Sequence, residues 1–256
     1  MEDKNEKIKR SGALAFQMII SLFYTAILIH MTYILISRRS EGWSNAVMIY
    51  LPQLLILISS MALQFFLKIN HRTHSQEGVL PILFSFIALE ATMILQDYMA
   101  IIDMYAVPTE VLVYASRFSV LGTAIIFLFS SIQFYGTNLS RSWLYLGFAL
   151  ASVAYITFAL PISAPTGSDI KIFTSSANGD IVMLCYFIIN IAAIATYAVA
   201  VVKDRATHSP LRSLGYTLLI IGNIMSLGYT PIPSITSVVV YIGGIIILGK
   251  TAKDSF

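Results

Sequence analysis

The most informative feature of this 256-residue sequence is how little charge it carries. Charged residues make up 11% of the chain and apolar residues 57%, with a mean hydropathy of +0.78. A water-soluble domain has about 25% charged residues, so the composition excludes a soluble enzyme with a wetted surface. The 14 glycines and 8 prolines are too few for a collagen-like or low-complexity chain. The composition therefore predicts an integral membrane protein.

Cysteine and histidine are also scarce, with one cysteine and four histidines. A single cysteine excludes a disulfide framework and a thiolate metal cluster, and we expect Cys185 as a buried thiol. Only His30 falls within an apolar stretch, whereas an intramembrane zinc hydrolase needs about three ligands on facing helices. The sequence contains no G-x-G-x-x-G, Walker, G-x-S-x-G or H-E-x-x-H pattern. We therefore expect no enzymatic activity, no metal, no cofactor and no nucleic-acid partner.

Charged residues divide the chain into apolar stretches of roughly 20 residues, the length that crosses a bilayer. The pattern predicts an all-α, polytopic bundle of eight transmembrane helices in a single transmembrane domain over residues 1–256. The predicted spans are 11–36, 47–67, 78–102, 110–134, 143–162, 180–202, 211–228 and 234–249. We expect a turn at the Pro-Ile-Pro sequence 231–233, and the alternative for the last two segments is a re-entrant hairpin. The longest connection, about 163–179, is expected to be an outer loop.

Lysine and arginine are distributed unevenly between the two sides of the predicted bundle. Twelve of these residues fall on the side of the termini, three on the other side, and Arg117 lies within a span. The twelve are Lys4, Lys7, Lys9, Arg10, Lys68, Arg72, Arg141, Lys203, Arg205, Arg212, Lys250 and Lys253. This bias predicts that the short termini, 1–10 and 250–256, are cytoplasmic in a plasma (inner) membrane. The same residues are expected to contact anionic lipids of the bilayer.

One short sequence hints at internal repetition. Thr-His-Ser follows a basic cluster both after Lys68 and after Lys203. A parallel four-plus-four duplication would make these two loops equivalent. Chance identity is the alternative, because the neighbouring spans show no convincing match.

Small residues within the spans indicate close contacts between helices. They include Gly147, Gly222 and the Gly243–Gly244 pair. We expect these positions to pack within a compact bundle or at a contact between copies of the chain.

Polar side chains inside the spans are few, and each is a candidate functional residue because its burial in lipid is costly. At a rise of about 1.5 Å per residue, His30, Gln53, Asp97 and Arg117 share a level about 10 Å from the outer boundary. Asp97 and Arg117 lie on consecutive antiparallel spans, so we expect an ion pair that binds a ligand or fixes helix register. A contact with Asp97 would make His30 a protonation switch.

A second polar level lies near the midplane, with Glu90, Asn190 and Asn223 on three different spans. No cation is expected at the depth of Glu90, so this carboxyl should be protonated, hydrated or bound to an ion. Seven residues separate Glu90 from Asp97, which predicts a ladder of carboxylates on one helix face. The alternative is that Glu90 holds helices together through hydrogen bonds to Asn190 or Asn223.

These levels favour transport or permeation of a small solute or an ion through an outward-facing polar pocket between the first four helices. Asp97 and Arg117 would form an outer gate, and Glu90 would be the coupling site. One alternative is a sensory or accessory membrane module that binds an outside ligand and acts through a partner membrane protein. A second alternative is a purely structural subunit. The oligomeric state is left open, with a homo-oligomer or a complex with a partner membrane protein as the candidates.

Overall fold

The computed structural model describes residues 2–39, 43–69, 79–104, 107–136, 142–160, 179–203, 209–228 and 231–251. Within these ranges the regular structure is helical and contains no strand. The helices are α1 (Glu2–Arg38), α2 (Trp43–Ile69), α3 (Leu80–Glu90), α4 (Thr92–Ile101), α5 (Thr109–Phe134), α6 (Ser142–Ala159), α8 (Gly179–Lys203), α9 (Pro210–Ser226) and α10 (Pro231–Thr251). Most of the predicted 163–179 loop, and most of both Thr-His-Ser loops, lies outside the described residues.

The helices confirm a multi-pass helical membrane protein. Among the described residues, six segments are long and apolar enough to cross a membrane. They are Gly12–Arg38, Trp43–Lys68, Leu80–Ile101, Glu110–Phe134, Gly179–Lys203 and Pro231–Thr251. The segment Leu80–Ile101 combines α3 and α4, so each predicted stretch corresponds to one helical rod. α6 and the 17-residue α9 are the shorter members.

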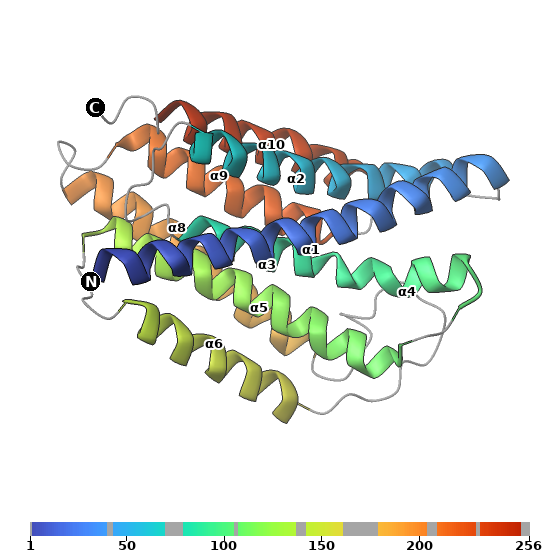
Figure 1. Ribbon diagram of the computed structural model, residues 1–256, viewed down its shortest axis with the longest axis horizontal. Helices are drawn as coiled ribbons and strands as arrows, with labels where there is room; N and C mark the ends of the chain where they lie inside the picture. Colours follow the sequence, from blue (N-terminus) through green and yellow to red (C-terminus); the bar gives the residue numbers. More distant parts are fainter. Residues whose placement is uncertain are drawn as a thin grey trace.

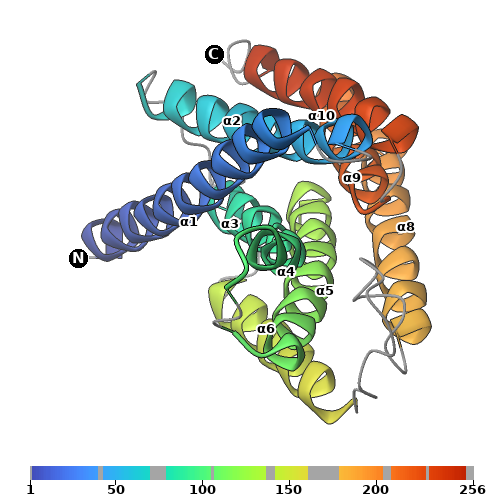
Figure 2. The ribbon, with the colours of Figure 1, turned by 90° about the vertical axis from the view of Figure 1, so that its right-hand side faces the viewer.

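The rods lie roughly along one axis, and α1 begins at the same end of the bundle at which α10 ends (Figure 1). Viewed along the bundle, α3 and α4 lie at the centre, with α1 and α2 on one side and α5 on another (Figure 2). In an 18-residue stretch of Leu80–Ile101, 72% is buried inside the bundle, and the buried share of the corresponding stretch in Glu110–Phe134 is 67%. In each of the other four segments the buried share is at most 39%. Polar side chains on these two central segments therefore face protein more than lipid.

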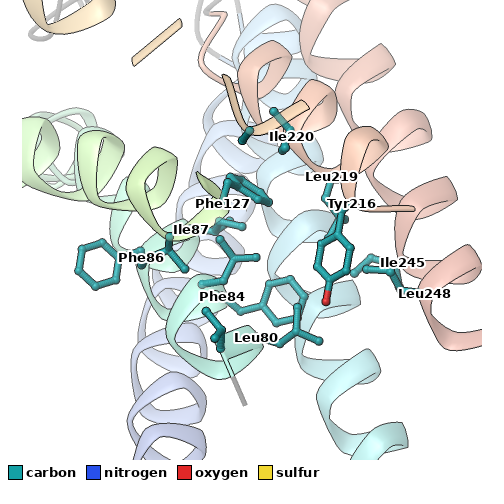
Figure 3. Close-up of a cluster of buried hydrophobic side chains, with 14 of the residues drawn as sticks. Leu80, Phe84, Phe86, Ile87, Phe127, Tyr216, Leu219, Ile220, Ile245 and Leu248 are labelled. Carbon is teal, nitrogen blue, oxygen red and sulfur yellow. The ribbon is translucent and has the colours of Figure 1, made fainter. Parts of the chain in front are cut away.

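A large apolar cluster fills the half of the bundle that contains the beginning of α3. Phe84 of α3, Phe127 of α5, Leu219 of α9 and Leu248 of α10 converge there (Figure 3). Each of these side chains is at most 5% exposed. The apolar cluster forms a closed core, because large side chains from four helices leave little space for water.

Helix α8 shows how spacing along the sequence selects a buried face. Its buried residues recur every three or four positions, which is the period of one helix face. They are Gly179, Val182, Tyr186, Asn190, Ala193, Tyr197 and Ala200, and α8 packs mainly against α5. Cys185 lies outside this buried face and is exposed. The expectation of a buried thiol was therefore wrong, because Cys185 lies next to the stripe and outside it.

The Pro-Ile-Pro sequence is part of a helix and does not form the predicted turn. α10 begins at Pro231 and runs for 21 residues, so the last segment is longer than predicted. Proline is tolerated in the first helical turn because its missing N–H would have no intrahelical partner there. The hydroxyl of Ser234 donates a hydrogen bond of 2.9 Å to the carbonyl of Gly228, which joins α10 to the end of α9.

Glycines bring α9 and α10 into close contact. A Cβ at Gly222 would lie 2.9 Å from backbone atoms of Tyr241, and one at Gly244 would lie 2.8 Å from the carbonyl oxygen of Gly215. Gly147 of α6 differs, because no atom of the described residues lies within 4 Å of its Cβ position. Close packing within the bundle is therefore confirmed for Gly222 and Gly244, whereas for Gly147 the contact between copies of the chain stays a prediction.

The two halves of the chain pack differently. α1 packs against α2 and α3, whereas α6, its equivalent in a four-plus-four duplication, packs mainly against α5. The arrangement of the helices thus gives no support to the internal repeat.

Candidate functional site

Glu90 is the last residue of α3 and lies in the interior of the bundle, 7% exposed. Its Oε1 accepts a hydrogen bond of 3.3 Å from Nδ2 of Asn223 on α9. The side chain of Thr123, on α5, lies beside the same carboxyl group. Of the two asparagines expected as partners, Asn223 is therefore the one that contacts Glu90. The contact joins the central rod to α9, with α5 alongside.

Tyr186 of α8 extends this group by one residue. Its hydroxyl accepts a hydrogen bond of 3.1 Å from Nδ2 of Asn223, and its side chain is fully buried. Asn190 lies one turn further along α8 and donates to the backbone carbonyl of Tyr186 at 3.0 Å. Tyr186 was not among the residues predicted from the sequence, although its position four residues before Asn190 places both on one helix face.

The helix is interrupted directly after Glu90. The N–H of Ala91 donates to the carbonyl of Ala88 at 3.1 Å, and the N–H of Ile94 donates to the carbonyl of Ala91 at 3.0 Å. Both bonds span three residues, so α3 and α4 are joined by a tight turn of the 3₁₀ type. Such a turn inside a helix often marks a functional hinge. Glu90 ends α3 and Asp97 lies in α4, with this one turn residue between the two helices, so the ladder of carboxylates stays a prediction.

A small cavity lies at this break. Its polar lining consists of Gln53 from α2, Glu90 from α3, and Asn223 and Ser226 from α9. Measured by the positions open to the centre of a water molecule, the volume is about 20 Å³, which suits one water-sized occupant. The predicted pocket lay between the first four spans, but α9 takes part here because it packs beside the central rod.

The cavity has unused capacity to bind a positive group. Oδ1 of Asn223 is buried and has no hydrogen-bond partner among the described residues. The hydroxyl of Ser226 donates to the backbone carbonyl of Asn223 at 2.7 Å, which leaves its oxygen able to accept. Buried polar atoms are nearly always satisfied, so an orphaned acceptor at a cavity indicates a missing donor or cation.

The cavity is closed from one side by the apolar cluster. Ile56 and Ile87 belong to that cluster and also line the cavity. Any species that passes the site must therefore cross a packed apolar region, which requires movement of the helices around it.

His30, Asp97 and Arg117, which the sequence places at one outer level, each contact a different partner. The Tyr50 hydroxyl donates to Oδ2 of Asp97 at 2.9 Å, and Nδ1 of His30 is hydrogen-bonded to the Tyr98 hydroxyl at 2.8 Å. Arg38 donates to the backbone carbonyl of Ile101 at 3.1 Å. These three contacts fasten α4 to α1 and α2. His30 meets Tyr98 and not Asp97, so the expected switch pair is not formed.

Arg117 lies on the other side of the central rod. Its side chain is fully buried, and Nη1 donates to the backbone carbonyl of Leu160 at 3.1 Å, at the end of α6. A cation at a helix C-terminus is favoured by the helix dipole. No ion pair joins Asp97 to Arg117, both of which the structure describes, because Asp97 faces α2 and Arg117 faces α6. The predicted outer gate made of this pair was therefore wrong.

Within the described ranges, no group of three or more His, Cys, Asp or Glu side chains is placed to hold a metal ion. Comparisons with protein-family models, with curated proteins and with solved structures found no match. Function is therefore inferred from the chemistry of the site itself.

Proposed function

We propose that this protein carries a small ion across the membrane, with Glu90 as the binding group in the membrane interior. The observation that carries the proposal is the water-sized cavity at the break between α3 and α4, lined by Glu90, Gln53, Asn223 and Ser226. A buried carboxyl next to unused oxygen acceptors is an arrangement typical of ion and proton paths. Broken helices at midplane sites serve the same purpose in many transporters.

The size of the cavity favours an ion or a proton over an organic solute. Sites for small organic molecules have volumes of about 300–1,000 Å³, whereas this cavity offers about 20 Å³. A sugar or an amino acid would need a much larger opening of the bundle. The broader expectation of a small solute therefore narrows to an ion or a coupled proton.

The break at Ala91 supplies a means of movement. α4 lies beyond the break and is fastened to α1 and α2 by the contacts of Asp97, Tyr98 and Ile101. α3 lies before the break, within the apolar cluster. A hinge at this turn would allow the lining of the cavity to change without unfolding either helix, while α1 stays in contact with both segments.

The test is ion flux into liposomes that contain the purified protein. Glu90→Gln keeps the size of the side chain and removes its charge, so we expect flux to fall to the level of protein-free liposomes. Glu110→Gln is the matched control, because the same change is made at an exposed residue in the first turn of α5. The control should retain wild-type flux, and both variants should fold.

Two results would contradict this proposal. Wild-type liposomes with no flux above background for protons, Na⁺, Li⁺ or K⁺ would favour the sensory or accessory module, or a structural subunit. Equal flux in wild type and Glu90→Gln would place the ion path elsewhere.

A further inference from the structure

We propose that the cavity at Glu90 binds one dehydrated monovalent cation of the Na⁺ or Li⁺ type. The inference rests on the proposed function, because it names the ion that the same site would hold. Its ligands would be the carboxylate of Glu90, the amide oxygens of Gln53 and Asn223, and the hydroxyl of Ser226, all of which line the cavity.

The ligand atoms are those that small hard cations prefer. Carboxylate, amide and hydroxyl oxygens bind such cations, whereas transition metals favour imidazole and thiolate groups. The lining contributed by the described part of the chain contains no histidine or cysteine.

Asn223 is oriented so that one oxygen remains available. Its Nδ2 is directed to Oε1 of Glu90 and to the hydroxyl of Tyr186. Its Oδ1 is then the buried amide atom that no described side chain satisfies. A cation beside Glu90 would satisfy this acceptor and would also keep the amide in the orientation observed.

The charge of the cavity selects a single positive charge. Among the residues that the structure describes, Glu90 is the only acidic one in the lining, and the other polar lining residues are neutral. A monovalent cation would leave the site neutral, whereas a divalent cation would leave a net positive charge in the membrane interior. An uncompensated buried charge is strongly unfavourable.

Size then separates the monovalent cations from one another. A cavity of about 20 Å³ holds one water-sized species. Bare Na⁺ and Li⁺ are smaller than a water molecule, so they approach the lining oxygens more closely than Cs⁺ does and are attracted more strongly. Choline is several times larger than the water-sized space and presents no bare charge to the oxygens. The site would therefore bind Na⁺ and Li⁺ in preference to Cs⁺ and to organic cations such as choline.

The experiment is thermal unfolding of the full-length protein in detergent at constant ionic strength, with choline chloride replaced stepwise by NaCl, LiCl or CsCl. A ligand that binds only the folded state raises Tm in a saturable way. We expect NaCl or LiCl to raise the wild-type Tm, CsCl to have little effect, and Glu90→Gln to abolish the response.

A milder pair of variants keeps the test decisive if Glu90→Gln folds poorly. Ser226→Ala removes one ligand and should raise the Na⁺ or Li⁺ concentration at half-saturation several-fold. Ser59→Ala is the matched control, because Ser59 is also half-buried and donates to the carbonyl three residues earlier, at 2.9 Å. Ser59 does not line the cavity, so its variant should keep the wild-type response.

Three outcomes would overturn the inference. These are equal effects of NaCl, CsCl and choline chloride, a full Na⁺ or Li⁺ response in Glu90→Gln, and equal responses of the two serine variants. The proposed function fails separately: Glu90-dependent proton flux without cation stabilisation would overturn only the cation site. Cation stabilisation without any flux would support the cation site and contradict transport.

Discussion

The outer end of α4 and the cavity at Glu90 both place a carboxylate inside a membrane bundle, yet they differ in what the neighbouring groups leave unused. At the outer end, Asp97 accepts from Tyr50, and Tyr98 is paired with His30. At the cavity, Glu90 contacts Asn223, but Oδ1 of Asn223 has no hydrogen-bond partner among the described residues and the cavity adjoins both side chains. A paired polar group fastens helices together, whereas an unsatisfied one beside a cavity retains the capacity to bind.

The break at Ala91 explains why two carboxylates on one rod behave differently. α4 is a regular helix whose outer residues meet α1 and α2 directly. Glu90 lies where the rod changes from α3 to α4, next to a turn that interrupts regular packing. The cavity is found at this interruption, and the outer contacts are found where the helix is continuous.

The largest effect is expected when Asn223 and Asn190 are each replaced and the two variants are compared. Asn223→Leu removes a contact of Glu90 and an oxygen of the cavity, whereas Asn190→Leu removes contacts with the carbonyl and the side chain of Tyr186 and leaves those of Glu90 in place. A lost buried hydrogen bond to a charged group costs about 1.5–3 kcal/mol, or roughly 10- to 150-fold in ion affinity. Flux titrated against ion concentration should show this loss for Asn223→Leu alone. A similar loss for Asn190→Leu would mean that the site extends along α8.

The next effect concerns the helix contact beside Asn223. Gly222→Ala would place a methyl group 2.9 Å from backbone atoms of Tyr241, so α9 and α10 must separate. Overpacking of this kind costs about 1–3 kcal/mol, and the shift should also displace Asn223 and reduce flux. Unfolding in a denaturing detergent measures the change in stability.

Gly147→Ala provides the matched control for that prediction. Nothing lies within 4 Å of the added methyl group, so stability should be unchanged or should rise by up to about 1 kcal/mol through helix propensity. Equal destabilisation of the two variants would show that the close approach of α9 and α10 is not the reason why a larger side chain at position 222 lowers stability.

A smaller effect is expected at the outer end of the central rod. Tyr50→Phe removes the hydroxyl that donates to Asp97 and should reduce the free energy of unfolding by about 1–2 kcal/mol. The ion response measured by Tm should remain, because Tyr50 does not line the cavity. Loss of that response would show that the outer contacts and the midplane site act as one unit.

The smallest effect is expected for His30→Phe. The His30 contact with Tyr98 lies on the outer surface of the bundle within a span. An apolar phenylalanine suits those surroundings and offsets the lost hydrogen bond, so stability should change by about 0.5 kcal/mol or less. Flux measured between pH 5 and 8 should have the same pH dependence as wild type. A changed pH profile would restore His30 as a protonation switch.

The location of Glu90 was predictable, and its surroundings were predictable only in part. Counting residues along each span placed Glu90 and Asn223 at one depth, and the structure brings them into contact. The same counting placed Asp97 and Arg117 together, although they face opposite neighbours. Depth follows from position along a helix, whereas contact also requires the rotation of each helix about its axis. That rotation is set by packing against helices distant in the sequence.

By itself the sequence determined that the chain is a multi-pass helical membrane protein whose first helix begins at the end of the bundle at which its last helix ends, because stretches of about 20 apolar residues cross a bilayer as helices. Only the tertiary structure decided that the third span breaks after Glu90 and that α9 completes the cavity. It also decided that Gly222 lies in a helix contact and Gly147 does not. These features depend on which helix faces meet, and side-chain packing between distant segments selects those faces.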